Sequence, residues 1–341
     1  MSPLTIEQIA TLSGVSRSTV SRVVNDHPRV SPHVRARVRR VIEERGYAPN
    51  AAARSLAGSC TKVICLLIVR GTATIFTNQY FPPLVQGISE ACNASGYYLM
   101  LSMVQAGQAT LFYHRVVHGS HCDGIMMLAN DIDPGMVALL LKDRTPYVLI
   151  GKHPAYPDLN SVDVENFEGA RLAVRRLLGL GHRRIATITG CLSTSPGAER
   201  YDGYVMALQE AGLTVVQDLV AQGDLTGQSG YVAMHRLLLV AERPTAVFAA
   251  DDAMAGGALR AIREVGLRVP HDIALIGFDD VPAATLMDPQ LTTIRQPIHR
   301  LGAQAARLFI DQLRGQEVAP VQQRLPVELV IRQSCGAPVR A

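Results

Sequence analysis

The chain has 341 residues, 48% of them hydrophobic and 18% charged, so it is long enough for more than one domain and has a globular composition. It contains no tryptophan and only 5% aromatic residues, which argues against an aromatic stacking platform for single-stranded nucleic acid. Residues 1–60 carry nine arginines, no lysine and four acids, a net charge of +5 (nine minus four), whereas the whole chain has +4. This local excess fits either a solvated basic face or a surface that binds polyphosphate.

The cysteines and the N-terminus indicate the compartment. The six cysteines show neither metal-ligand spacing nor a disulfide framework, which predicts reduced thiols and no metal or other cofactor. The first 20 residues lack the pattern of a signal peptide, and the apolar run 63–69 is too short to cross a bilayer. We therefore expect a cytoplasmic protein with no membrane partner.

Residues 5–46 predict three short helices that form a compact module. Each helix begins at a side chain that can cap it, and two of them end at glycine, the residue that favours the left-handed conformation there. Valines at helical spacing give the second and third helices one apolar face each. The capping residues are Thr5, Ser16 and Ser31, and the terminating glycines are Gly14 and Gly46.

The remaining chain predicts an α/β core behind a linker. Residues 47–61 form the linker, in which 51–57 could make two helical turns that are unstable alone. From residue 62, apolar runs of strand length alternate with helix-length segments over about 280 residues, which predicts two lobes of parallel sheet with helices on both faces. The expected strands are 63–69, 97–104, 124–128, 146–151, 184–189, 245–249 and 273–277, and the expected helices are 82–95, 168–180, 200–211, 229–241 and 254–265.

The N-terminal motif is specific. It reads GVSRSTVSRVVN at 14–25, with LTIEQIA at 4–10 before it and Val30-Ser31, GYAPN at 46–50 and LAG at 56–58 after it. In sequence and spacing these segments closely resemble the helix-turn-helix headpiece of the lactose/galactose-repressor (LacI) family. The resemblance implies an all-α DNA-binding domain over 1–49, followed by a hinge helix and linker over 50–61.

The resemblance implies that the second helix enters the major groove with its N-terminal residues at base edges. Arg17, Ser18 and Arg22 point outward if the valines of this helix point inward, and Arg22 could contact guanine in a bidentate manner. Each contact has a structural alternative, such as helix capping or a solvated charge. The other residues expected at DNA, mostly short polar groups suited to phosphate oxygens, are Thr5, Ser16, Thr19, Ser21, Asn25, Arg29, Tyr47 and Asn50.

The hinge segment has its own implied role. In the family, two hinge helices of a dimer pair in the minor groove, and a leucine from each wedges into the central base step. Leu56 matches that leucine. The alternative is a linker residue that touches the core.

Residues 62–341 resemble the family's core, which is periplasmic-binding-protein-like and consists of two doubly wound lobes with the effector between them. Lobe 1 is expected over about 62–164 and 294–322, and lobe 2 over about 165–293 and 323–335. The motifs that carry this resemblance are GHRRIA at 181–186, Arg200 with Gly203-Tyr204, ADDAMA at 250–255, IALIGFDD at 273–280 and LTTIRQ at 291–296.

Two acids and one arginine make chemical sense as effector contacts. Asp251 and Asp279 each follow an expected strand, where open α/β sheets place their ligands, and carboxylates accept hydrogen bonds from sugar hydroxyls. Arg200 could donate to ligand oxygens while it balances these acids, or it could only bridge the lobes. The resemblance adds Phe81 and Gln296 as effector contacts. The neighbouring acids Asp252 and Asp280 are expected to be strand-end or helix-capping groups.

Two departures leave the effector open. Many family members have an acid after the fourth strand, but this chain has Gly151-Lys152, which looks more like regulators that sense maltose-type glucosides. Leu225 stands where some members have a stacking aromatic residue. A nucleobase effector therefore stays open beside a sugar.

The sequence predicts a transcription regulator and not an enzyme. It has no phosphate-binding loop, nucleophile elbow or histidine pair with metal spacing. We expect a repressor that binds a pseudo-palindromic operator as a homodimer, since no leucine heptads follow Val330, and that a saccharide such as a maltose-type glucoside releases. The alternatives are a solute-binding protein of a sugar transporter, which residues 1–60 disfavour, and a regulator whose ligand is a corepressor.

Overall fold

The computed structural model describes residues 4–24, 27–47, 60–69, 76–105, 107–119, 121–129, 134–316 and 321–336. The chain divides into two compact units, residues 1–61 and 62–341. Among the described residues, no helix combines the length and the apolar character needed to cross a membrane. The expected DNA contacts Asn25 and Asn50 and the expected wedge Leu56 lie outside the described residues.

The headpiece contains the three predicted helices, α1 (Ile6–Ser13), α2 (Arg17–Val24) and α3 (Pro32–Arg45). The capping box is present, because Thr5 donates its N–H to Gln8 Oε1 at 2.8 Å and its hydroxyl accepts from the Gln8 N–H at 3.4 Å. Ser16 and Ser31 cap α2 and α3 as predicted, and Gly14 and Gly46 adopt the left-handed conformation at the ends of α1 and α3. The side chains buried between the helices are Ile9, Ala10, Val20, Val23 and Val38.

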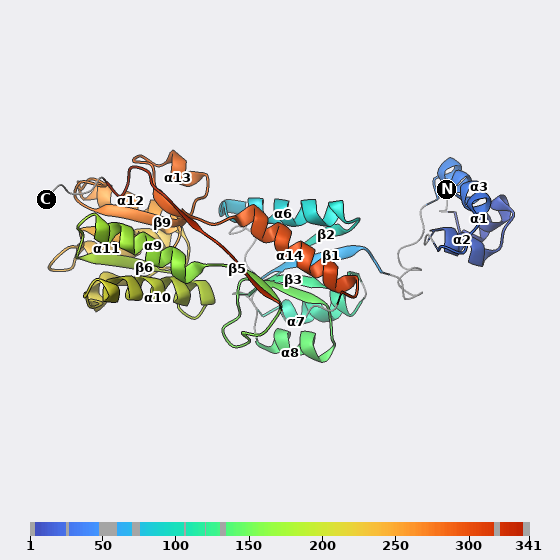
Figure 1. Cartoon of the computed structure of the whole chain (residues 1–341), viewed down its shortest axis with the longest axis horizontal. Coiled ribbons are helices and arrows are strands. Elements are labelled where there is room, and N and C mark those ends of the chain that lie inside the picture. Colours follow the sequence, from blue (N-terminus) through green and yellow to red (C-terminus); the bar gives the residue numbers. More distant parts are fainter. Residues whose placement is uncertain are drawn as a thin grey trace. The chain divides into compact units, whose positions relative to one another are not determined.

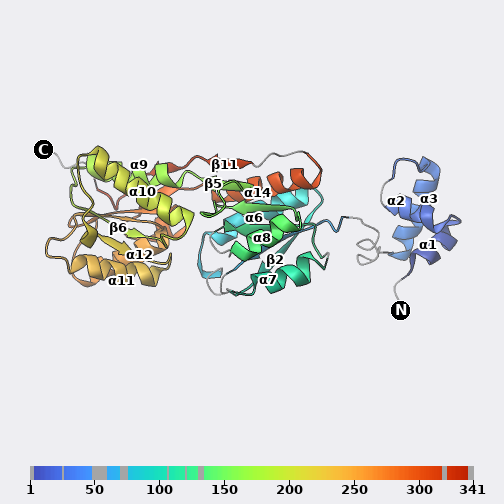
Figure 2. The same cartoon turned by 90° about the horizontal axis from the view of Figure 1, so that it is seen from below.

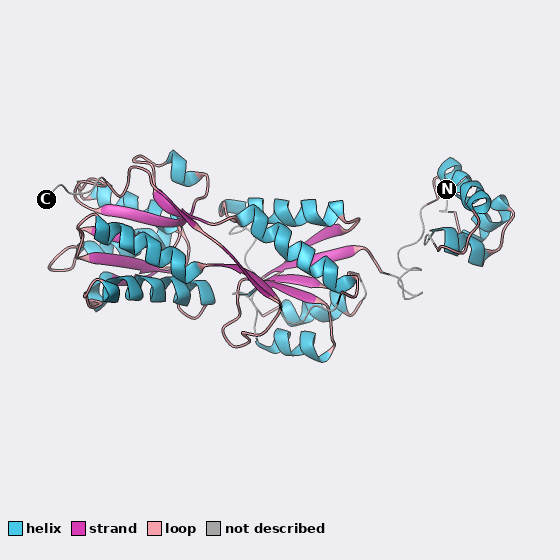
Figure 3. Cartoon of the chain, in the orientation of Figure 1, coloured by secondary structure: helices cyan, strands magenta, loops and turns pink. Residues whose placement is uncertain are grey.

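Within the described residues, the second unit contains two sheets with helices on both faces, which confirms the predicted two-lobed α/β core, but each sheet has six strands, whereas the sequence predicted seven strands in all (Figures 1 and 3). The first sheet has the order β11-β5-β4-β3-β1-β2 and the second β12-β10-β9-β8-β6-β7; all pairs are parallel except β10 with β12. The strands of the first sheet are β1 (Val63–Ile68), β2 (Tyr98–Met103), β3 (Ile125–Leu128), β4 (Tyr147–Ile150), β5 (Ser161–Val164) and β11 (Gln322–Leu325). Those of the second are β6 (Ile185–Thr189), β7 (Val220–Gln222), β8 (Ala246–Ala249), β9 (Ala274–Asp279), β10 (Thr292–Arg295) and β12 (Glu328–Val330).

Alternation along the strands divides each lobe's core in two. In β1, Ile64, Leu66 and Ile68 pack on one face of the sheet, and Cys65 and Leu67 pack on the other. Helices α6 (Phe81–Ala94) and α14 (Ile298–Leu313) cover the first face, and α7 (Ala109–Phe112), the π-helical turn η1 (Tyr113–Val117) and α8 (Pro134–Lys142) cover the second. The second sheet lies between α9 (Asn166–Gly179) with α10 (Ser195–Glu210) and α11 (Gly227–Leu238) with α12 (Asp252–Glu264); α13 (Ala283–Leu286) and η3 (Gln217–Leu219) are short.

The chain crosses between the lobes later than predicted. The expected crossovers at 294 and 322 cut through two strands, since β10 belongs to the second sheet and β11 pairs with β5 in the first (Figure 2). Both strands are four residues long. β11 pairs with the much earlier strand β5, and β10 lies between the preceding strand β9 and the later strand β12, so no local pattern indicates where the chain changes sheets.

Two glycines allow α6 and α14 to lie in close contact (Figure 1). A Cβ atom at Gly87 would overlap the carbonyl oxygen of His299, and one at Gly302 would overlap that of Leu84. Neither obstacle is a flexible side chain. Any substitution must therefore push the helices apart and disturb the core of the first lobe.

We predict that Gly302→Ala lowers the free energy of unfolding by about 1–3 kcal/mol, the range for overpacking a well-packed core. The matched control is Gly179→Ala in α9, where the added methyl group meets no atom within 4 Å apart from its chain neighbours and the backbone of its own helix. This control should be neutral or stabilise by up to about 1 kcal/mol, because alanine favours the helix. Urea denaturation of both variants measures the difference, and equal effects would contradict the close-packing role of Gly302.

Candidate ligand-binding site and nucleic-acid interface

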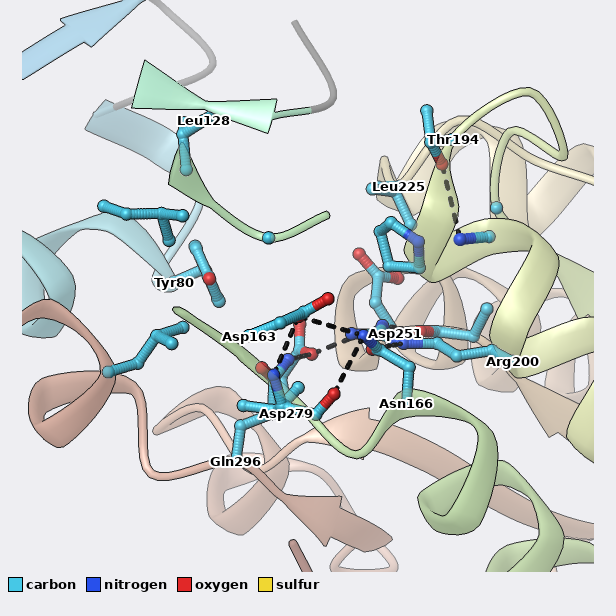
Figure 4. A pocket seen from close by; sticks show the side chains of 18 of the residues that line it. Tyr80, Leu128, Asp163, Asn166, Thr194, Arg200, Leu225, Asp251, Asp279 and Gln296 are labelled. Atoms are coloured by element: carbon cyan, nitrogen blue, oxygen red, sulfur yellow. Dashed lines mark hydrogen bonds and ion pairs between the residues drawn. The ribbon is translucent and has the colours of Figure 1, made fainter. Parts of the chain in front are cut away.

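One pocket brings together all five residues expected at the effector, which are Phe81, Arg200, Asp251, Asp279 and Gln296. Figure 4 shows the last four of them. The lining of the pocket comes from the ends of β3, β4 and β5 in the first lobe and from the ends of β8 and β9 in the second. Carboxyl ends of parallel strands leave backbone and side-chain groups free for ligands at one edge of a sheet. Ligand contact by these five residues stays a prediction.

Arg200 is the cation of the pocket and is only 7% exposed. Its Nε donates to Asn166 Oδ1 at 2.9 Å and its Nη1 to the Ala250 carbonyl at 2.5 Å, and the guanidinium lies 3.7 Å from the centre of the Phe278 ring. Nη1 also lies 3.6 Å from Asp279 Oδ1. These contacts replace the water that a buried charge has lost, and they fix the orientation of the guanidinium in the wall of the pocket.

The two predicted acids have different local roles. Asp251 caps α12, since its Oδ1 accepts from the Met254 N–H at 2.7 Å. Asp279 ends β9 with φ at +115°, a conformation that only a few non-glycine residues adopt, and its Oδ1 also accepts from Gln296 Nε2. Strain of this kind persists only where the surrounding contacts compensate it.

Burial raises the pKa of both acids. The pKa of Asp251 is raised to about 7, first by burial and then by the nearby charge of Asp279, whereas the Met254 N–H and Arg200 act in the opposite direction. The pKa of Asp279 is raised by burial to about 6, with Arg200 and Gln296 opposing. The two carboxyl groups beside Arg200 therefore keep their protons up to a higher pH than carboxyl groups dissolved in water do.

Asp252 and Asp280 are structural acids, as expected. Asp252 accepts from the Val281 N–H at 3.0 Å and from the Thr293 hydroxyl at 2.6 Å. Asp280 lies 2.6 Å from Nε of Arg295 and 2.6 Å from Nη2 of Arg332. Their oxygens thus link the start of α12 and the loop after β9 to β10 and to the segment that follows β12.

The structure adds pocket residues that the sequence reasoning missed, chiefly Asp163 and Asn166. Asp163 lies within β5, a strand too short and too polar to be recognised from its apolar pattern. Asn166 begins α9, two residues after β5 ends. In the sequence, the only signal for this pair is an acid that stands between two valines, with an asparagine three residues after it. Gly151 and Leu225, the two departures from the family pattern, also line the pocket.

A second cavity adjoins the first and shares Asn78, Leu225, Asp251 and Asp279 with it. It has a volume of about 470 Å³ and is also lined by Thr226 and Met287 among others. The space available to a ligand therefore extends beyond the first pocket.

In the headpiece, the side chains expected at base edges face solvent. Arg17, Ser18 and Arg22 are exposed on α2, and Arg17 Nε lies 3.1 Å from Glu7 Oε1. An exposed ion pair of this kind contributes little to stability, so it leaves Arg17 available to a phosphate or a base. Of the other expected contacts, Thr5, Ser16 and Arg29 are exposed, and Thr19, Ser21 and Tyr47 are half-buried.

Comparisons with known proteins agree over nearly the whole chain. Residues 5–50 match the family of bacterial regulatory proteins, lacI family, and residues 174–335 match the periplasmic binding protein-like domain. The chain is 38% identical over 332 residues to the HTH-type transcriptional regulator CelR of Thermobifida fusca, covering 97% of this chain and 98% of CelR. It is 39% identical over 313 residues to the HTH-type transcriptional repressor PurR of Pectobacterium carotovorum, covering 91% and 90% of the two chains.

Solved structures show the same relationship. A CelR–cellobiose complex superimposes with a TM-score of 0.78 at 36% identity and covers 97% of this chain and 99% of the other. The lac repressor dimer bound to operator and the anti-inducer ONPF superimposes with a TM-score of 0.84 at 30% identity, covering 98% and 100%. These relatives are regulators of transcription.

We predict that the contribution of Asp251 to stability falls as the pH rises. Its pKa is about 3.9 in an unfolded chain and about 7 here, so between these values the folded state binds the additional proton and loses that advantage as the pH approaches 7. Asp251→Asn retains a helix-capping side chain. Relative to the wild type, this variant should therefore gain about 1–3 kcal/mol in unfolding free energy between pH 5 and pH 8.

Urea denaturation at the two pH values measures this gain. Asp272→Asn is the control, because Asp272 is exposed and its pKa is lowered, chiefly by a hydrogen bond from the Arg268 N–H. Its ionisation is complete well below pH 5, so the difference between this variant and the wild type should not change over the interval. A pH-independent difference between wild type and Asp251→Asn would contradict the raised pKa.

Proposed function

The chain belongs to the LacI family of bacterial transcriptional regulators, and from this premise we propose a repressor that leaves its operator when a small saccharide binds the pocket around Arg200. The observation that carries the proposal is the convergence of Arg200, Asp251 and Asp279 at the strand ends of an α/β core. A guanidinium and carboxylates are the groups that donate to and accept from sugar hydroxyls.

The DNA-binding half of the proposal is a homodimer on a pseudo-palindromic operator. A two-fold dimer places two recognition helices about one helical turn of DNA apart, so each half-site meets one copy of α2. The exposed Arg17, Ser18 and Arg22 support base contact by this helix. For residues 50–58 we retain the prediction of a hinge helix in the minor groove with Leu56 as its wedge.

The proposed effector is a neutral saccharide with more than one ring. Two adjoining cavities that share Asp251 and Asp279 offer more space than the first pocket alone. The similarity to CelR, which binds cellobiose in its complex, supports a glucoside. Tyr80 and Phe81 at the edge of the pocket supply apolar surface for a sugar ring.

Release from DNA requires a coupling free energy between the two sites. Such couplings amount to about 1–3 kcal/mol, or roughly 5- to 150-fold in affinity. The chain passes three times between the two sheets, after β5, β10 and β11, so movement of one lobe acts on several connections at once. A corepressor would bind the same pocket, but the coupling free energy would have the opposite sign, so that ligand binding would increase the affinity for DNA.

We predict that Asp279→Asn abolishes the response to ligand and leaves DNA binding intact. The amide keeps the size of the carboxyl but replaces one acceptor by a donor, which leaves ligand hydroxyls unpaired at a cost of about 1–3 kcal/mol for each lost bond. The assay is release of a labelled operator, selected from random duplexes with the full-length protein, on addition of cellobiose and maltose. The control is Asp202→Asn on α10, an exposed acid outside the pocket. Wild-type release by the Asp279→Asn protein would show that the site is misplaced.

We also predict that Arg22→Ala reduces affinity for the selected operator by about 1–3 kcal/mol, the value of one good bidentate base contact, and affects random duplex far less. Arg40→Ala, an exposed arginine of α3, removes the same charge without touching α2. Gel-shift titrations at one fixed salt concentration compare the two variants on both duplexes. An equal loss from both substitutions would reduce the role of Arg22 to net charge.

A further inference from the structure

Asp163 is a buried acid with one oxygen that accepts no hydrogen bond from the described residues. It is 7% exposed and lies in β5 of the first lobe, where it lines the pocket. Its Oδ1 accepts from the Val164 N–H at 2.7 Å and from Asn166 Nδ2 at 3.2 Å. Within the described part of the chain, Oδ2 is buried and has no hydrogen-bond partner. A buried acceptor without a partner costs free energy, so its retention calls for an explanation.

The position of Asp163 supplies that explanation. Figure 4 shows it beside Asp251, Asp279 and Arg200, with Asn166 joining Asp163 to Arg200 through hydrogen bonds. Asp251 and Asp279 come from the second lobe, whereas Asp163 comes from the first. A ligand hydroxyl at Oδ2 would therefore give the effector a charged acceptor on each side of the cleft.

The charges around the pocket are unbalanced. Among the described residues that line it, three are carboxylic acids and one is a guanidinium. That guanidinium already donates to Asn166 and Ala250 and lies beside Asp279. The lining thus offers many acceptors and little positive charge for an anion.

We propose that Asp163 accepts a hydroxyl of the effector from the first lobe, and that together with Asp251 and Asp279 it restricts the effector to uncharged, hydroxyl-rich compounds. This inference rests on the proposed function, because it names the chemical class that the same pocket accepts. Phosphorylated and carboxylated sugars are the excluded class. Their oxygens are acceptors, and their charge has the same sign as the three acids.

Burial is consistent with this role. It raises the pKa of Asp163, and the charge of Glu199 acts in the same direction, while Arg200 and Arg324 oppose. A hydroxyl that donates to Oδ2 would replace the water that burial has removed and would stabilise the carboxylate. Hydrogen bonds to charged acceptors are among the stronger ones in proteins.

Asp163→Asn separates a ligand role from a structural one. The Asn side chain has the same shape, and its oxygen can still accept from Val164 and Asn166, so the local structure is retained. The second oxygen becomes an amide that donates instead of accepting. We expect an unchanged or higher Tm without ligand, unchanged operator affinity, and at least tenfold weaker binding of neutral sugars.

The experiment uses the full-length protein and calorimetric titration with two matched pairs, cellobiose with cellobionate and glucose with glucose 6-phosphate. Wild type should bind a neutral member at least tenfold more tightly than its anionic counterpart, and Asp163→Asn should narrow that ratio. Asp158→Asn, an exposed acid outside the pocket, is the control and should behave as wild type.

Each outcome decides the inference. Equal or tighter binding of an anionic member by wild type overturns the charge selection, and unchanged sugar affinity in Asp163→Asn overturns the role of Asp163. A clear fall in Tm without ligand also overturns it, because Asp163 would then be a structural acid. If wild type binds none of these sugars, the saccharide proposal and this inference both fail, whereas binding of neutral sugars that Asp163→Asn leaves unchanged overturns the inference alone.

Discussion

The pocket depends on the burial of one guanidinium. Moving a cation out of water costs several kcal/mol unless charged and polar groups replace its hydration shell. Around Arg200 these groups are Asn166 at the start of α9, the Ala250 carbonyl after β8 and Asp279 at the end of β9, with the Phe278 ring against its face. The same contacts that compensate the charge therefore fix the relative positions of three elements of the second lobe.

This compensation leaves acidic groups in excess. One arginine cannot balance Asp163, Asp251 and Asp279, and burial accordingly raises the pKa of all three. An excess of this kind, like the positive φ of Asp279, is a cost to the unliganded fold. Binding sites often retain such costs, since a ligand that supplies the missing donors recovers them. The pocket is thus less stable empty than a purely structural core would be.

The headpiece is stabilised by contacts of a different kind. Its core is a few small side chains, among them Ile9, Val20 and Val38, so its stability relies on helix caps as much as on burial. Its surface can then carry many arginines, which concentrate positive charge in this unit. The core domain, with its two sheets buried on both faces, needs no such charge. The chain combines these two physically distinct units, and each of them matches its own family model.

The sequence by itself determined the features that local interactions control. The caps at Thr5, Ser16 and Ser31 and the longer apolar strands involve neighbours a few residues apart, so their patterns can be read directly. The tertiary structure alone decided where β5, β10 and β11 lie, because these strands are short and each has one partner that is distant in the chain: β5 pairs with β11, and β10 with β12. It also decided that Asp163 meets Asp279 and Arg200 in one pocket. Whether an acid is buried and lacks a partner depends on atoms more than a hundred residues away, and no local pattern records them.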